Sequence, residues 1–344
     1  AAGGGSIIHF DGARYRVGPE SAGAVPGPAC YRRGGPLTIT DCNVMLGRIR
    51  PEFFPAVFGP QGDQPLDAAT VCERFSALAT GITRQTGDSR STTAVAEGFL
   101  AIAIANMAHA IRHISTQRGH DVKGYTLCSF GGAGSQHACG VADALGIRRI
   151  LLHPLAGVLS ALGIGLAALR ELTEVTVEEP LNAATLAGLR PSIETCGMTL
   201  QRRLIDQGAD PARCEVRVEL AIKVAGSDCP LPLPLPPGAD AAAMAAAFVQ
   251  AHRQRFGFAP EHPPWRIQSF TVEAIGHPAG LAADGSLDYG DPPGERIAAV
   301  HPVVFGGQTL PSPFRSRNGL LVGEPLAGPA VILEACSTIV VEPG

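Results

Sequence analysis

Apolar residues in the first half of the chain recur at two different spacings, one typical of helices and one typical of strands. Spacings of three and four residues predict amphipathic helices, and short apolar runs bounded by Gly, Asp or Pro predict strands. A strand, a helix, a strand and a helix follow one another between residues 125 and 168, which is typical of a βαβ-type unit with parallel strands. The predicted helices are 66–85, 91–118, 135–145 and 157–168, and the predicted strands are 6–10, 15–17, 125–130 and 149–153.

The pattern changes after about residue 171, where strands become more frequent. Pro and Leu alternate over 229–237, which suits an edge strand or a polyproline II segment because proline cannot donate a ladder hydrogen bond. We expect two domains: an α/β domain over 1–172 and an α+β, strand-rich domain over 173–344. The other elements expected here are strands at 173–178, 215–224, 265–275 and 331–341, helices at 184–207 and 239–256, and a linker at 278–294.

An irregular segment rich in Gly and Pro covers residues 18–31 and leads into a short predicted helix at 42–48. Prolines prevent a regular ladder or helix in this segment, and long irregular loops inside compact domains are usually functional or disordered. Asp41 precedes the short helix. Two interpretations are open for its carboxylate: an N-cap of the helix, or a ligand for a metal–phosphate group.

The run Ser-Phe-Gly-Gly-Ala-Gly-Ser-Gln-His-Ala-Cys at 129–139 connects a predicted strand to a predicted helix. Glycine has no Cβ, so its backbone can approach a ligand closely, and the N–H groups that open a helix favour an anion. The alternative is a plain turn that uses glycine only for its positive φ. The motif by itself does not decide between the two.

Composition excludes several classes of function. The 344 residues are 45% hydrophobic and 17% charged, with a formal net charge of −4, so a sizeable core is available and there is no basic excess for binding nucleic acid. No run of about 18 uninterrupted apolar residues predicts a membrane span. The nine cysteines form no CxxC pair, which indicates a reducing, cytoplasmic setting. The chain begins at Ala1 without Met and ends at Gly344, so we expect a piece of a longer protein.

A few side chains stand out as candidates for chemistry. His109 and His113 are four apart on a predicted helix, but Ala110 stands where a zinc protease has Glu, so they more simply complement the helix dipole. Cys139 follows His137 by two positions, and these side chains diverge on a helix. Cys30, at the end of the Gly/Pro segment, is a second candidate thiol without an identifiable base.

Several segments, taken in order along the chain, indicate a protein family more specifically than any single motif does. Together they resemble the hydantoinase A / 5-oxoprolinase family over essentially the whole chain. The segments are AAGGGSI at 1–7, VGPESAGAVPGPACYRRGGPLTITDCN at 17–43, LGRI at 46–49, AVAEGFLAIAIANMAHAIRHISTQRGHD at 94–121, FGGAGSQHACGVADALGI at 130–147, HPLAGVLSALGI at 153–164 and GPAVILEACSTIVVEPG at 328–344. FGPQGDQPLD at 58–67 and GSDC at 226–229 look most like the ATP-hydrolysing 5-oxoprolinases.

The resemblance implies one lobe of an actin-like (ribonuclease H-like) ATPase fold followed by an α+β, strand-rich domain. It implies hydrolysis of 5-oxo-L-proline to L-glutamate with ATP and Mg²⁺, by a cytoplasmic enzyme that is a homo-oligomer and works with a hydantoinase B-type domain or subunit. A related hydantoinase or ketone carboxylase subunit is the alternative. A piece of the enzyme would act alone only as a scaffold. Catalytic and metal-binding residues stay unassigned.

The nucleotide-binding positions that the resemblance implies fall in two segments. A glycine turn on the adenosine side corresponds to Gly131, Gly132, Ala133 and Gly134, and a segment near the phosphates or the interlobe cleft corresponds to Gly3, Gly4, Gly5 and Ser6. The sequence departs from the family in three places. It contains no DxGGTxTD segment, Cys42 replaces a usual Ala, and residues 223–226 read Lys-Val-Ala-Gly where the family has Arg-Tyr-x-Gly.

Overall fold

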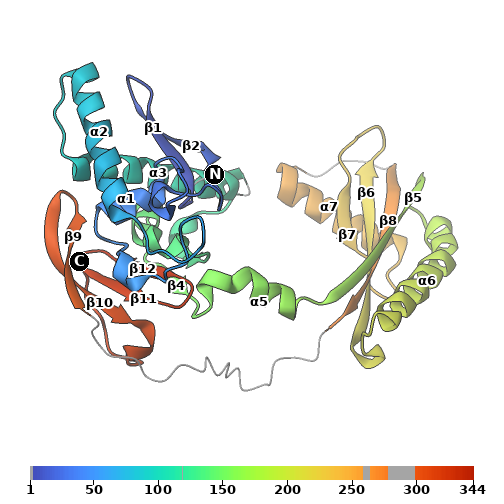
Figure 1. The fold of residues 1–344 in the computed structure, drawn as a ribbon. Coiled ribbons are helices and arrows are strands. Elements are labelled where there is room, and N and C mark those ends of the chain that lie inside the picture. The colour runs from blue at the N-terminus through green and yellow to red at the C-terminus, as the bar shows by residue number, and fades with distance from the viewer. Residues whose placement is uncertain (1–2, 118, 259–263, 278–298) are drawn as a thin grey trace. The chain divides into compact units, whose positions relative to one another are not determined.

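A computed structural model describes residues 3–117, 119–258, 264–277 and 299–344 of the chain. The chain divides into two compact units (Figure 1). The first unit contains Ala1–Leu162 and Asp288–Gly344, and the second contains Gly163–Leu287. The linker expected at 278–294 lies outside the described residues.

The first unit begins with the expected hairpin and continues into three helices around one core. The strands pair antiparallel, with Phe10 opposite Tyr15. Helix α2 begins where the Asp67 carboxylate accepts the Thr70 N–H at 2.9 Å, and it ends at the left-handed residue Gly87. Both are common helix boundaries. The elements are β1 (Ser6–Phe10), β2 (Tyr15–Ser21), η1 (Ala29–Tyr31), α1 (Ile39–Met45), η2 (Pro51–Phe53), α2 (Ala68–Thr86) and α3 (Thr92–Gln117).

Helix α3 is long and apolar enough, by length and composition, to cross a membrane, and it is the one such helix among the described residues. In this structure its inward side chains lie in the core of the first unit. Val95, Phe99 and Ala103 are fully buried and pack with Phe75 of α2. The spacing of four between these positions places them on one face of the helix.

The predicted βαβ-type unit is confirmed. Strands β3 and β4 pair in parallel, with Thr126 opposite Arg149, and Gly146 ends the intervening helix in the left-handed conformation. Val141 and Leu145 of that helix pack on Ala108 of α3 in a small separate core. The elements are η3 (Val122–Gly124), β3 (Thr126–Ser129), η4 (Gly134–Gln136), α4 (Ala138–Leu145), β4 (Arg149–Leu152), η5 (Ala156–Val158) and α5 (Leu159–Leu166).

The C-terminal strands form a sheet that belongs to the first unit. The strand order is β12-β11-β10-β9, and β12 contacts α4 and η4. The sequence-based division at 172/173 instead places these strands with the second half of the chain. The strand expected at 331–341 is two antiparallel strands with a turn between them, because Glu334–Ser337 closes a turn hydrogen bond. The elements are β9 (Ala299–Phe305), β10 (Gln308–Ser316), η7 (Arg317–Gly319), β11 (Ala330–Leu333) and β12 (Thr338–Val341).

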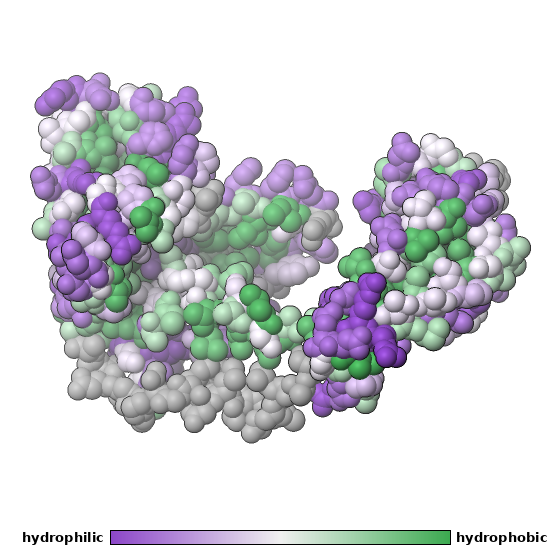
Figure 2. All heavy atoms as spheres, turned by 45° about the vertical axis from the view of Figure 1, so that its right-hand side comes forward, coloured by the Kyte–Doolittle hydropathy of each residue, from purple (hydrophilic) through white to green (hydrophobic). Residues whose placement is uncertain are grey.

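The second unit is an antiparallel sheet with helices α6 and α7 packed on it (Figure 1). The order is β5-β8-β6-β7, so the Pro/Leu strand β7 lies at an edge, as predicted. Phe248 and Phe270 are fully buried in its core. Polar side chains cover much of the face of this unit that is seen in Figure 2. The elements are β5 (Leu169–Pro180), α6 (Ala183–Asp206), η6 (Pro211–Arg213), β6 (Cys214–Val224), β7 (Leu231–Pro234), α7 (Ala241–Phe256) and β8 (Trp265–Gly276).

Candidate functional site

A cavity of about 430 Å³ in the first unit is lined by both glycine-rich segments that the sequence singled out. Gly4 and Gly5 line it from the turn before β1, and Gly132 and Ala133 line it from the turn after β3. The turn between β11 and β12 forms a further wall. The volume falls within the usual range of small-molecule sites.

The two glycine-rich segments approach each other closely. A Cβ on Gly4 would lie 3.1 Å from the Cβ of Ala133 and 2.7 Å from Oγ1 of Thr40. Thr40 holds the Gly4 turn, because both its backbone N–H and its hydroxyl donate to the Gly4 carbonyl, at 2.8 and 3.0 Å. Position 4 therefore requires glycine for reasons of space.

The residues that line the cavity include four whose backbone N–H groups have no partner among the described residues. In the part of the chain that the structure describes, no hydrogen bond uses the N–H groups of Gly4, Gly5, Gly132 or Ala133. Successive free backbone N–H groups form concave sites that attract anions. This arrangement favours a ligand with a negatively charged group.

The other predicted site residues lie behind this surface and shape the turns. Ser6 is buried, and its hydroxyl accepts the Gly3 N–H at 3.0 Å. Gly131 has a φ of 89° and donates its N–H to the Ala156 carbonyl at 2.8 Å. Gly134 faces a neighbouring apolar groove instead of the cavity.

An aromatic wall of the cavity was not predicted from the sequence. Tyr31 and Phe58 face each other with ring centroids 4.5 Å apart, and Phe53 stacks on Phe314 of β10 at 4.9 Å. Phe54 and Ile49 complete this apolar region. These residues come from single 3-10 turns, the loops beside them and strand β10. They share no periodic pattern, so only the folded chain brings them together.

Asp41 has a structural role in this fold. Its buried carboxylate accepts hydrogen bonds from the backbone N–H groups of Ala29, Cys30 and Thr38, at 3.0, 2.9 and 2.8 Å. It lies at the third position of α1 in a capping box with Thr38, which is the N-cap. The carboxylate fastens the irregular 18–31 segment to the start of α1, because both of its oxygens are occupied by these donors.

His137 and Cys139, two positions apart in the sequence, form no hydrogen-bonded thiol–imidazole pair. His137 is 2% exposed, and neither ring nitrogen has a hydrogen-bond partner among the described residues. Burial, together with the charge of Arg48, lowers the pKa of His137 to about 4. Cys139 directs its thiol to the Val340 carbonyl at 3.6 Å, and burial raises its pKa.

The remaining candidates from the sequence do not form a reactive or metal-binding site here. Cys30 is fully buried, and burial and the nearby Asp41 carboxylate raise its pKa. His109 and His113 are exposed on α3 with ring centroids 6.2 Å apart. Within residues 3–117, 119–258, 264–277 and 299–344, no group of three His, Cys, Asp or Glu side chains is arranged to hold a metal ion.

Sequence comparison places the chain in a known family. The family model described as Hydantoinase/oxoprolinase matches residues 1–173, and the chain belongs to this family. A similar relative is 5-oxoprolinase 1 of Arabidopsis thaliana, 34% identical over all of this chain and 28% of the relative. Caprolactamase subunit alpha of Pseudomonas jessenii is 29% identical over all of this chain and 49% of that subunit. The chain thus spans only about a quarter to a half of the length of these relatives.

Solved structures confirm the predicted fold class. The nucleotide-free structure of acetone carboxylase, an enzyme of ATP-dependent acetone carboxylation, matches with a TM-score of 0.78 at 18% identity. The match covers 100% of this chain and 50% of that chain. The ATP-dependent caprolactamase of Pseudomonas jessenii matches with a TM-score of 0.73 at 28% identity, over 99% and 50%. The fold is α/β, with the actin-like lobe and the strand-rich α+β region that the sequence predicted.

Proposed function

We propose that this chain is part of an ATP-dependent cyclic amide hydrolase that opens 5-oxo-L-proline to L-glutamate. The observation that carries the proposal is the 430 Å³ cavity, which is lined by two glycine-rich turns whose backbone N–H groups at Gly4, Gly5, Gly132 and Ala133 have no partner among the described residues. Similarity to 5-oxoprolinase 1 supports the choice of lactam. The activity belongs to the longer enzyme, to which this chain would contribute one wall of the nucleotide site.

The chemistry explains why ATP is needed. A lactam is a poor electrophile because its nitrogen donates electron density to the carbonyl, and a phosphoryl group on the amide oxygen makes the ring carbon a better electrophile. Water then adds to that carbon, the C–N bond breaks to free the amine and leave an acyl phosphate, and hydrolysis of the acyl phosphate gives L-glutamate and inorganic phosphate. Phosphoryl transfer depends mainly on positioning and on stabilising negative charge. In the proposed site, the N–H groups of Gly4 and Gly5 would supply part of that stabilisation, and Gly132 and Ala133 would bound the adenosine side.

The remaining parts of the proposal concern the whole enzyme. In the longer enzyme, Mg²⁺ bound to the phosphates would neutralise part of their charge during transfer. A hydantoinase B-type domain or subunit would complete the enzyme, as the name "subunit alpha" of the caprolactamase relative suggests by analogy. A homo-oligomeric, cytoplasmic enzyme is the assembly and location that we propose.

The direct test is an assay of ADP release by the full-length protein with its partner subunit, in the presence and absence of 5-oxoproline. We expect release to depend on the lactam and to produce L-glutamate in equal amount. If nucleotide is hydrolysed with no dependence on any cyclic amide, the proposal is wrong.

A second candidate is a related enzyme that activates another carbonyl compound with ATP. The similarity to caprolactamase and to acetone carboxylase favours it. A panel of 5-oxoproline, hydantoin, caprolactam and acetone with bicarbonate separates these activities, because the pocket contacts determine the ratio of kcat/KM values. The isolated chain could also be a scaffold, and calorimetry that detects micromolar ATP binding to it would contradict that role.

A further inference from the structure

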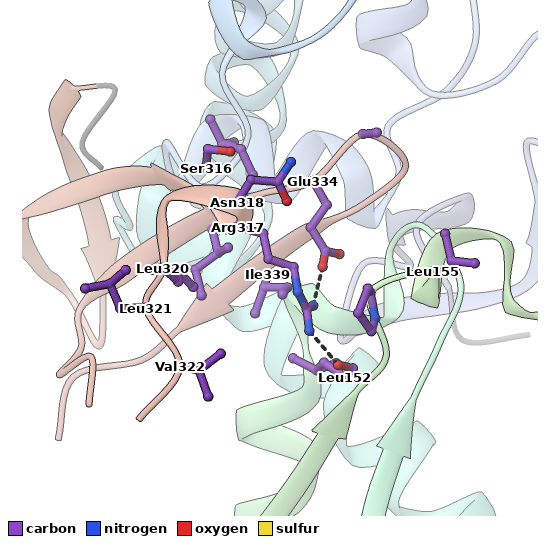
Figure 3. Close-up of a pocket in the computed structure, with 14 residues that line it drawn as sticks. Leu152, Leu155, Ser316, Arg317, Asn318, Leu320, Leu321, Val322, Glu334 and Ile339 are labelled. Carbon is purple, nitrogen blue, oxygen red and sulfur yellow. Dashed lines mark hydrogen bonds and ion pairs between the residues drawn. The ribbon is translucent and has the colours of Figure 1, made fainter. Parts of the chain in front are cut away.

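The turn between β11 and β12, residues Glu334–Ser337, separates the candidate cavity from a second groove in the first unit. The second groove has a volume of about 880 Å³ (Figure 3). Leu333, Glu334 and Ala335 line both spaces. This turn is therefore a thin wall with open space on two sides.

On the groove side, one arginine ties the turn to the rest of the unit. Nη1 of Arg317 pairs with the Glu334 carboxylate, and Nη2 donates to the Leu152 carbonyl at 2.9 Å (Figure 3). Leu152 is the last residue of β4, just before the segment that leads to Gly157. A single guanidinium thus joins β4, η7 and the start of the turn.

The Glu334 carboxylate is buried, with a side-chain exposure of 6%. It also accepts the Ser337 hydroxyl, and the Glu334 N–H donates to the Ser337 carbonyl at 3.0 Å. A buried carboxylate that loses its cationic partner becomes an uncompensated charge, which is strongly destabilising. Without Arg317, a displaced turn that exposes the Glu334 carboxylate to water has a lower free energy than the native turn.

On the cavity side, the tip of the turn lies directly against the glycine-rich segment. A Cβ on Gly132 would lie 3.3 Å from the Cys336 carbonyl oxygen, and a Cβ on Gly157 only 2.3 Å from it. Gly132 lines the candidate nucleotide cavity. A shift of the turn therefore changes the shape of the cavity at Gly132.

We propose that Arg317 is a positioning residue for nucleotide binding: from outside the cavity, it holds the Glu334–Ser337 turn against Gly132. The inference rests on the proposed function, because it takes the cavity to be the nucleotide site. Arg317 does not line that cavity, so it acts on the ligand only through the turn.

The test compares Arg317→Ala, Arg317→Lys and the control Arg90→Ala in the full-length protein. Arg90 pairs with Asp88 at 2.7 Å on the exposed surface of the same unit. The readouts are hydrogen exchange of the 331–341 segment without nucleotide, and the KM for ATP with kcat measured alongside. If Arg317→Ala does not fold, Glu334→Gln removes the buried charge while keeping the shape of the side chain.

For Arg317→Ala we expect faster exchange of the 331–341 segment and about a 10-fold higher KM for ATP, because small displacements of positioning groups carry large kinetic effects. Arg317→Lys should give a KM for ATP between those of wild type and Arg317→Ala, since one ammonium group cannot reach both the Glu334 carboxylate and the Leu152 carbonyl. Arg90→Ala should change neither readout.

Two results would overturn the inference. One is unchanged exchange of the 331–341 segment, and the other is faster exchange with an unchanged KM for ATP, which would make the ion pair merely structural. A wild-type protein that neither binds nor hydrolyses ATP would instead refute the proposed function, and the role of Arg317 in nucleotide binding with it.

Discussion

The burial of His137 changes the role that its sequence position suggests. His137 lies directly before α4, 2% exposed, beside the buried cation Arg48. Its position two residues before Cys139 suggests a base for that thiol, but desolvation lowers the pKa of the imidazole to about 4 and keeps it neutral at pH values where a free histidine is charged. The residue therefore influences stability and its pH dependence instead of nucleophilic chemistry.

The pH dependence of folding tests this assignment. The pKa of His137 is about 4 in the folded chain against 6.5 as its ordinary value, so the unfolded chain binds more protons between these values. Stability is then fully present above pH 6.5 and falls as the pH drops toward 4. Between pH 7 and pH 5, wild type should lose about 2 kcal/mol more than His137→Gln in urea unfolding. Equal losses in the two proteins would contradict the assignment.

Neighbouring glycines give a matched test of the cavity. A Cβ on Gly4 meets Thr40 and Ala133, whereas a Cβ on Gly3 meets nothing within 4 Å. We expect Gly4→Ala to weaken ATP binding about 10-fold, because the wall of the cavity must move. Gly3, which the family resemblance places at the nucleotide site, does not line the cavity, so Gly3→Ala should stay within about 2-fold. Calorimetry on the full-length protein measures both. Equal effects of the two substitutions would show that the close contact at Gly4 is unimportant.

At the scale of elements, the periodic patterns predicted most helices and strands within a few residues. Helix α2 and helix α3 follow the expected spacing because each buries one continuous face in the core. The pattern failed at residues 331–341, where buried apolar residues on both sides of Glu334–Ser337 suggested one strand. A short turn inside an apolar run leaves little trace in periodicity, because the residues before and after it are buried alike.

A substitution at Gly157 tests whether the turn between β11 and β12 packs against this position. A Cβ at this position would lie 2.3 Å from the Cys336 carbonyl oxygen, whereas Gly163 in α5 has nothing within 4 Å. We expect Gly157→Ala to cost about 1–3 kcal/mol and to speed exchange of the 331–341 segment. Gly163→Ala should be neutral or stabilising, since alanine favours a helix interior. Thermal unfolding with hydrogen exchange measures both, and a neutral Gly157→Ala would mean that the turn is seated elsewhere.

At the scale of the whole molecule, the chain forms two compact units with separate cores. The family match over residues 1–173 and the strand-rich second half are continuous segments of the chain, so they can be recognised from the sequence alone. The return of β9–β12 to the first unit does not, because it depends on contacts with residues more than a hundred positions away. One such contact is the Val304 N–H, which donates to the Leu46 carbonyl at 2.9 Å.

Separate cores predict local effects of core substitutions. Phe270 is 1% exposed in the core of the second unit, and Phe270→Ala should cost about 3–5 kcal/mol there. We expect faster hydrogen exchange first in residues 163–258 and 264–277, and the reverse distribution for Phe99→Ala in the first unit. Exchange mapped by mass spectrometry checks this. A uniform increase over both units in either variant would indicate one cooperative structure.

The sequence by itself determined the family, the α/β class, the βαβ-type unit and the two glycine-rich segments, because these depend on local spacing and on residues that stand together in the chain. Only the tertiary structure decided that Gly4 and Ala133 lie side by side in the wall of one cavity, that the aromatic side chains at positions 31, 53, 54 and 58 line it, and that Arg317 reaches Glu334 behind it. Local patterns encode which face of an element is buried. They do not encode which distant element covers that face, because that choice depends on the packing of the whole unit.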